Sequence, residues 1–92
     1  MYVKENITIN NITLNAGATL DVASGKTLTI TGTFNNNGAT IQGAGTVNFG
    51  GTSSSQSVHG AFTNLTINNT LGVSIAANSS VSGVLTLTSA IS

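Results

Sequence analysis

The chain contains no cysteine, proline or tryptophan, and only four of its 92 residues carry a formal charge. Without cysteine it cannot hold disulfide staples or cysteine-based metal sites. Two lysines and no arginine cannot neutralise a row of phosphates, which excludes a nucleic-acid role. No segment approaches the roughly 20 apolar residues of a membrane-spanning helix, so we expect no insertion into a membrane.

Asparagine, serine and threonine take the place of charged residues, beside eleven glycines. Ordinary soluble domains carry roughly 25% charged residues against 4% here, so hydroxyl and amide groups must hydrate the surface. Hydrophobic residues make up 39% of the chain and many of them are β-branched, which is not typical of a disordered segment. The composition predicts a folded, weakly charged domain for which association is a standing risk.

Short apolar-polar-apolar triplets recur along the chain at a nearly constant spacing. Their first residues are separated by 16, 19, 18 and 20 positions, and Gly, Asn and Ser lie between them. Strict alternation over such short segments predicts many short strands and no helix. The triplets occupy residues 12–14, 28–30, 47–49, 65–67 and 85–87.

A longer self-similarity spans three of these short periods. A shift of 53 residues lays NITLNAGATLDVAS, residues 11–24, on NLTINNTLGVSIAA, residues 64–77, without a gap. A unit of this size cannot bury its own apolar face, whereas a stack of units buries it between neighbours. Both periodicities therefore favour a coiled stack.

The repeats predict an all-β fold, a parallel β-solenoid (β-helix) of about four to five coils with roughly 18 residues per coil. The alternative is a sandwich or barrel of hairpins, which requires no constant spacing and whose usual turn signals occur only at Asn37-Gly38. We expect residues 1–92 to form a single solenoid segment, with residues 1–11 as a partial first coil. The chain is further predicted to be an excerpt of a longer repeat protein.

In each triplet the two outer residues point inward and the middle residue points outward, because side chains alternate along a strand. A parallel stack places the middle residues in one exposed column with about 4.8 Å between neighbours. Charges repeated at that spacing would repel one another, whereas hydroxyls and amides can hydrogen-bond along the column. The expected contact ladder consists of Thr13, Thr29, Asn48, Thr66 and Thr86.

The chain offers few groups for catalysis or metal binding. Its only carboxyl side chains are Glu5 and Asp21, and a polysaccharide-active β-helix would need both of them across one cleft. Glu5 lies beside Lys4 near the N-terminus, and Asp21 takes an outward strand position. His59 is the only histidine and has no nearby carboxylate in the sequence. We therefore expect no catalytic residue, no metal site and no cofactor, and the protein is predicted not to be an enzyme.

The segment FTNLTINNTLGVSIAANSSVSGVLTLTSA, residues 62–90, carries a resemblance to a known class of repeats. Phe62 is followed by NLTINN at 64–69, by Gly72-Val73, and by a Val-x-Gly-x-Leu-x-Leu strand at 81–87. This order resembles the degenerate repeats of large secreted bacterial surface proteins, in the company of adhesins and autotransporter passenger domains. The resemblance implies an extracellular, cell-surface location and a structural or adhesive role as a rigid rod or stalk. An adhesive face of that kind would contact a glycan or another surface.

Ice binding is the alternative function, because some antifreeze proteins use Thr-x-Thr arrays on a β-helix. The stretch KTLTITGTF supplies Thr27, Thr29 and Thr31 as one rank, and Thr86 with Thr88 supplies another. The ranks between them contain Asn and Gly, and coils of 16 to 20 residues favour an uneven face. These interruptions favour the structural or adhesive module over the ice-binding solenoid.

The sequence also predicts that the protein binds itself. The last apolar strand is followed by no charged run and no proline that would shield the edge of a final coil. Zero net charge leaves little repulsion between two such ends. We expect end-to-end dimers or head-to-tail filaments that form through Leu85, Leu87 and Ile91.

Overall fold

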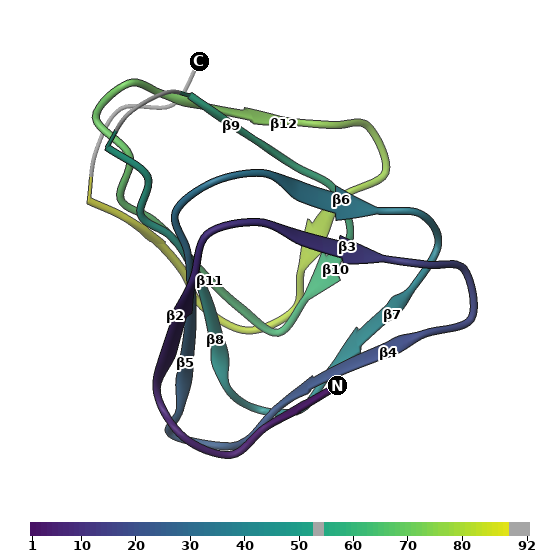
Figure 1. Ribbon diagram of the computed structural model, residues 1–92. Helices are drawn as coiled ribbons and strands as arrows, with labels where there is room; N and C mark the ends of the chain where they lie inside the picture. Colours follow the sequence, from purple (N-terminus) through teal and green to yellow (C-terminus); the bar gives the residue numbers. More distant parts are fainter. Residues whose placement is uncertain (53–54, 89–92) are drawn as a thin grey trace.

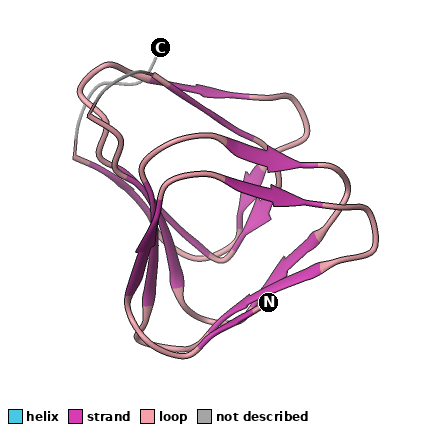
Figure 2. Cartoon of the chain, viewed as in Figure 1, coloured by secondary structure: helices cyan, strands magenta, loops and turns pink. Residues whose placement is uncertain are grey.

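The computed structural model describes residues 1–52 and 55–88 (Figure 1). This part of the chain consists of fourteen short strands joined by turns and contains no helix (Figure 2). Every ladder between strands is parallel, and the chain winds around one axis in about four coils. The prediction of a parallel β-solenoid is confirmed, and the hairpin alternative is wrong.

Each coil runs along three faces in turn, so that every third strand returns to the same face (Figure 1). Face 1 is one continuous sheet of β2 (Ile7–Ile9), β5 (Thr27–Ile30), β8 (Thr46–Phe49), β11 (Asn64–Ile67) and β14 (Leu85–Leu87). Face 2 holds β3 (Ile12–Leu14) with β6 (Phe34–Asn36), and then β9 (Gln56–Val58) with β12 (Val73–Ile75). Face 3 holds β1 (Tyr2–Val3), β4 (Thr19–Val22) and β7 (Thr40–Gln42), and then β10 (Ala61–Phe62) with β13 (Ser80–Val81).

The interior is a stack of aliphatic and phenylalanine side chains from all three faces. On face 1, Leu28, Val47 and Leu65 lie in register in successive strands and are at most 2% exposed. Equivalent positions from Ile7 to Leu85 are 21, 19, 18 and 20 residues apart. Because the strands stay in register, the corners must take up these differences in coil length.

The first predicted triplet, residues 12–14, lies on face 2 and not in the face 1 column. Thr13 pairs there with Asn35, so its placement in the contact ladder was wrong. Its place is taken by Thr8, which pairs with Thr29. The sequence NITINNITL holds two similar triplets in tandem, and the asparagine pair between them turns the chain from face 1 to face 2.

The 53-residue shift likewise matches positions on different faces, because residues 12–14 form β3 while β11 belongs to face 1. The structurally equivalent shift is 58 residues. It lays NITINN, residues 6–11, on NLTINN, residues 64–69, and matches β2 with β11 three coils later. The repeat is therefore real, and its register differs by five residues from the one that the sequence suggested.

The residues of the predicted association end keep the expected register but are not buried. Leu85 and Leu87 pair with Leu65 and Ile67, yet they are 46% and 52% exposed because no further coil of the described chain covers them. Ile91 lies outside the described residues. Within the described residues, the apolar column is thus closed in the middle of the stack and open at this end.

The second coil (β5 to β7) and the third coil (β8 to β10) are joined by a backbone ladder on face 1 alone. By contrast, ladders on all three faces join the first coil (β2 to β4) to the second, and the third to the fourth (β11 to β13). Three phenylalanine rings pack together at the sparsely bonded junction. The centroids of Phe34 and Phe49 are 5.3 Å apart in an edge-to-face contact, and Phe62 lies 6.1 Å from each of them.

Candidate functional site

The outward side chains of face 1 form a continuous uncharged column. Thr29, Asn48, Thr66 and Thr86 are successive partners in register, as the sequence predicted, and Thr8 extends the column. The Nδ2 atom of Asn48 donates to the Oγ1 atom of Thr29 across 3.4 Å. The two end residues of the column are exposed and the three middle ones are half-buried. The column therefore exists, while its role as a contact ladder stays a prediction.

Asparagine side chains tie successive coils together at the corners. The Oδ1 atom of Asn6 accepts the backbone N–H of Thr27 at 2.9 Å. Asn64 acts in both directions, since its Nδ2 atom donates to the Ala44 carbonyl at 3.0 Å and its Oδ1 atom accepts the Val84 N–H at 3.0 Å. These bonds satisfy corner backbone groups that no ladder reaches.

Glycine and asparagine are the residues that most readily take the left-handed backbone conformations needed at corners. Asn78, with φ of 65°, is the only non-glycine residue of the described chain with a positive φ. The left-handed corner positions belong mostly to glycine, for example Gly25 and Gly43. The bridging role of asparagine was missed, although an asparagine directly before the triplets in NIT and NLT was a signal for it.

The acidic side chains and the histidine lie on different parts of the coils. Asp21 is half-buried in β4, where its Oδ2 atom accepts from Nε2 of Gln42 at 3.1 Å. Glu5 is exposed between β1 and β2, and His59 is exposed after β9. Within residues 1–52 and 55–88, no three His, Asp or Glu side chains gather as a set of metal ligands would.

A buried amide pair lies inside the solenoid near the corner between faces 1 and 2. Gln56 is 4% exposed and Asn69 is fully buried. The Nε2 atom of Gln56 donates to the carbonyls of Ile30 and Gly32 at 2.8 and 2.9 Å. Its Oε1 atom accepts from the Gly51 N–H at 2.8 Å and from Nδ2 of Asn69 at 3.0 Å. One side chain thus connects the second, third and fourth coils.

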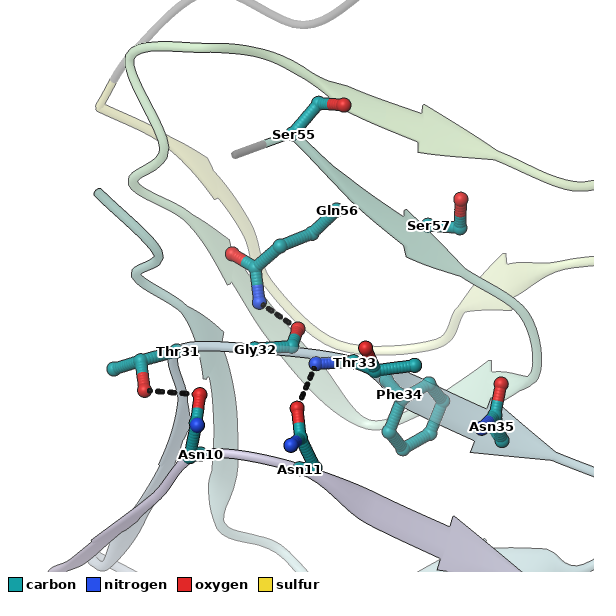
Figure 3. Close-up of a pocket in the computed structure, with 10 residues that line it drawn as sticks. All are labelled: Asn10, Asn11, Thr31, Gly32, Thr33, Phe34, Asn35, Ser55, Gln56 and Ser57. Carbon is teal, nitrogen blue, oxygen red and sulfur yellow. Dashed lines mark hydrogen bonds between the residues drawn. The ribbon is translucent and has the colours of Figure 1, made fainter. Parts of the chain in front are cut away.

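Two hollows on the described surface of the solenoid differ in the groups that line them. A groove of about 430 Å³ opens on face 2 beside Gln56, where β6 and β9 are not paired (Figure 3). A hollow of about 340 Å³ lies at the open end of the stack, against Leu65, Ile75, Val81 and Leu85. The groove is polar and the open end is apolar, so the two surfaces suit different partners.

The opposite end of the stack also exposes apolar side chains. Tyr2 and Ile7 are 64% and 37% exposed, and both belong to strands at the edges of their sheets. Within the described residues, both ends of the solenoid therefore present unpaired strand edges beside apolar groups.

No protein-family model matches the chain, and neither a curated protein nor a solved structure matches it. In the part of the chain that the structure describes, no helix is long and apolar enough to cross a membrane.

Proposed function

We propose that the protein is a structural and adhesive module of a rigid extracellular rod at a bacterial cell surface, which acts by stacking and contact and not by catalysis. One observation carries this proposal: the edge strands of face 1, β2 and β14, have no partner on their outer sides in the described chain. An unpaired edge beside an open apolar interior favours the addition of another strand. The extracellular location is supported by the resemblance to secreted bacterial repeats.

Head-to-tail stacking would continue the pattern of face 1 from one copy to the next. β14 reads Leu-Thr-Leu and β2 reads Ile-Thr-Ile, so Thr8 of one copy would extend the column above Thr86 of another. Ile7 would then cover Leu85, and each would lose apolar exposure. Head-to-head contact would bring two identical edges together antiparallel and interrupt the parallel sheet. Head-to-tail contact joins two different ends, so it is the arrangement that can build a filament.

The other two faces are compatible with the same arrangement. On face 3, β13 is the outermost strand at one end and β1 at the other, and their inward residues Val81 and Val3 would meet. Face 2 has four described strands, of which β3 and β12 are the outermost. Faces 1 and 3 have five described strands each. The two ends therefore fit as consecutive steps of one coil, with space for a single strand on face 2.

The 92-residue chain is expected to form oligomers whose size grows with concentration. Leu85→Lys places a charge in the apolar end and should raise the dissociation constant at least about tenfold, because the ammonium group would be buried without a partner. Thr86→Lys is the matched control, since it adds the same charge on the same strand but points outward. Sedimentation velocity over a concentration series measures both variants.

The stacking proposal fails if the unmodified chain stays monomeric at every concentration. It fails equally if Leu85→Lys and Thr86→Lys reduce assembly to the same extent while circular dichroism shows that both remain folded. Leu87→Lys offers a second charge at the same end and should act like Leu85→Lys.

Ice binding is a second candidate that one observation on face 1 favours. Thr27 and Thr29 lie in register with Thr46 and Asn48, so the outward ranks stay aligned although the coils differ in length. We expected unequal coils to disturb these ranks, and the corners absorb the inequality instead. Asn48 in the column and Asn64 in the neighbouring rank still interrupt the threonine array, which keeps the structural role ahead.

We expect the purified chain to produce no thermal hysteresis at micromolar concentration. Hysteresis that is lost in Thr29→Lys but kept in Thr13→Lys would replace the structural role with ice binding. Thr13 serves as the control because it is an exposed threonine on face 2.

A further inference from the structure

The groove on face 2 is built by the divergence of β6 and β9 (Figures 1 and 3). Its volume of about 430 Å³ falls in the range of small-molecule sites. At one end Nε2 of Gln56 reaches the Gly32 carbonyl at 2.9 Å, and at the other Nδ2 of Asn36 reaches the His59 carbonyl at 3.0 Å. Side-chain amides thus span the two ends of an opening that a backbone ladder would otherwise close.

Backbone groups along the edges of the groove point into it. The Thr33 carbonyl accepts a bond from β3, so the alternation of a parallel ladder directs the N–H and C=O of Phe34 toward β9. The Gln56 N–H donates to the chain at the start of β12, so the same alternation directs the N–H and C=O of Ser57 toward β6. No backbone hydrogen bond joins β6 to β9 within the described chain.

The side chains around these backbone groups are polar and uncharged. The four formally charged residues of the chain all lie elsewhere, so an ionic ligand would find no opposite charge in the groove. The lining aromatic residue, Phe34, is 6% exposed and packs inward against Phe49, so the groove also lacks an apolar wall. Its hydroxyl and amide groups come mainly from Asn10, Asn11, Thr33, Asn35, Ser55 and Ser57.

We propose that this groove binds a short neutral saccharide. Each hydroxyl of a sugar both donates and accepts hydrogen bonds, which matches a lining that offers N–H, C=O, amide and hydroxyl groups together. The inference rests on the adhesive part of the proposed function. It assigns the adhesive contact to face 2, at the junction of the second and third coils, and not to the column on face 1.

The test is an NMR titration of the ¹⁵N-labelled chain with cellobiose, maltose and di-N-acetylchitobiose, and with anionic N-acetylneuraminic acid. We expect at least one neutral disaccharide to shift the amide resonances of Phe34 and Ser57, with a dissociation constant in the range of about 1 to 10 mM. The anionic sugar should leave these resonances unchanged at the same concentration.

Ser57→Val removes one hydroxyl from the groove and should weaken saccharide binding about fivefold or more. Ser74→Val is the matched control, because Ser74 pairs with Ser57 in the ladder but lies on β12, outside the groove. Thr33→Val, directly before the facing strand β6, should weaken binding like Ser57→Val. The amide spectrum of each variant shows whether it remains folded.

The inference is overturned if none of the three neutral disaccharides shifts the groove resonances at about 50 mM. It is also overturned if the shifts map to face 1, if the anionic sugar binds more tightly, or if both valine variants bind like Ser74→Val. Sedimentation of the same samples separates this inference from the rod. A chain that stacks without binding sugar refutes the groove alone, and a monomer that binds sugar refutes the rod alone.

Discussion

Replacement of Gln56 by leucine is expected to lower the free energy of unfolding by roughly 3 to 5 kcal/mol. The side chain makes four hydrogen bonds inside the solenoid, so its loss leaves the buried Gly51 N–H and the Gly32 carbonyl without this partner, while the Ile30 carbonyl keeps its bond from the Gly50 N–H. Each such group costs about 1 to 3 kcal/mol when it stays buried and unsatisfied. Urea denaturation followed by circular dichroism measures the change.

Gln42→Leu is the matched control, because Gln42 is the other glutamine of the chain and is exposed on face 3. Its Nε2 atom makes one bond, to Asp21, so the substitution should cost less than about 1 kcal/mol. Similar losses in Gln42→Leu and Gln56→Leu would show that the buried amide does not hold the coils together.

Gln56→Glu keeps the size of the side chain and changes its hydrogen-bonding groups, so it tests the hydrogen bonds separately from the packing. Burial and the neighbouring carbonyls would raise the pKa of the new carboxyl group in the folded state above its unfolded value. Its protonated form would then be favoured on folding, so stability is present at low pH and is lost as the pH rises through the folded pKa. The free energy of unfolding of Gln56→Glu should therefore be higher at acidic than at neutral pH.

The repeat of apolar triplets was sufficient to predict the solenoid, because the period of a stacked fold is written into the spacing of its buried residues. Leu28, Val47 and Leu65 could be aligned from spacing alone, and they form the buried column of face 1. The first coil was misassigned because two triplets of the same composition follow each other within NITINNITL. Alternation shows which residues point inward, but it does not show on which face a strand lies.

The buried amide pair and the groove could not be predicted from the same pattern. Gln56 lies in a serine-rich segment without apolar neighbours on either side, which is typical of an exposed loop. Three of its four hydrogen-bond partners lie 13 to 26 residues away, among them Asn69 and Ile30. The groove depends on a ladder that does not form between β6 and β9, and local sequence carries no signal for a missing ladder.

These two features share one cause, the junction between the second and third coils. Where ladders on faces 2 and 3 are missing, the coils are held by the β5–β8 ladder, by side-chain amides and by the phenylalanine cluster. Aromatic rings are bulkier than the aliphatic side chains of the other layers, which is consistent with strands that separate around them. The same junction is thus the site of the groove and the place where the stack depends most on side chains.

Phe49→Ala is accordingly expected to lower the free energy of unfolding by roughly 3 to 5 kcal/mol and to separate the two halves of the solenoid. Phe49 is 0% exposed and contacts both other rings edge-on, at 5.3 Å from Phe34 and 6.1 Å from Phe62. Its removal leaves a cavity and two lost aromatic contacts of about 0.5 to 1.5 kcal/mol each. Hydrogen exchange of backbone amides should then show different opening free energies before and after the junction.

Leu20→Ala is the control for this loss of cooperativity, because Leu20 is equally buried but lies on face 3 in the first coil, which is laddered to the second on all three faces. It should cost roughly 2 to 5 kcal/mol and leave one cooperative transition. A single transition for Phe49→Ala, with uniform exchange along the chain, would contradict the view that the ring cluster couples the halves. Two transitions for both variants would place the weakness in the solenoid as a whole, since a stack of coils unfolds piecewise when its nearest-neighbour contacts are weak everywhere.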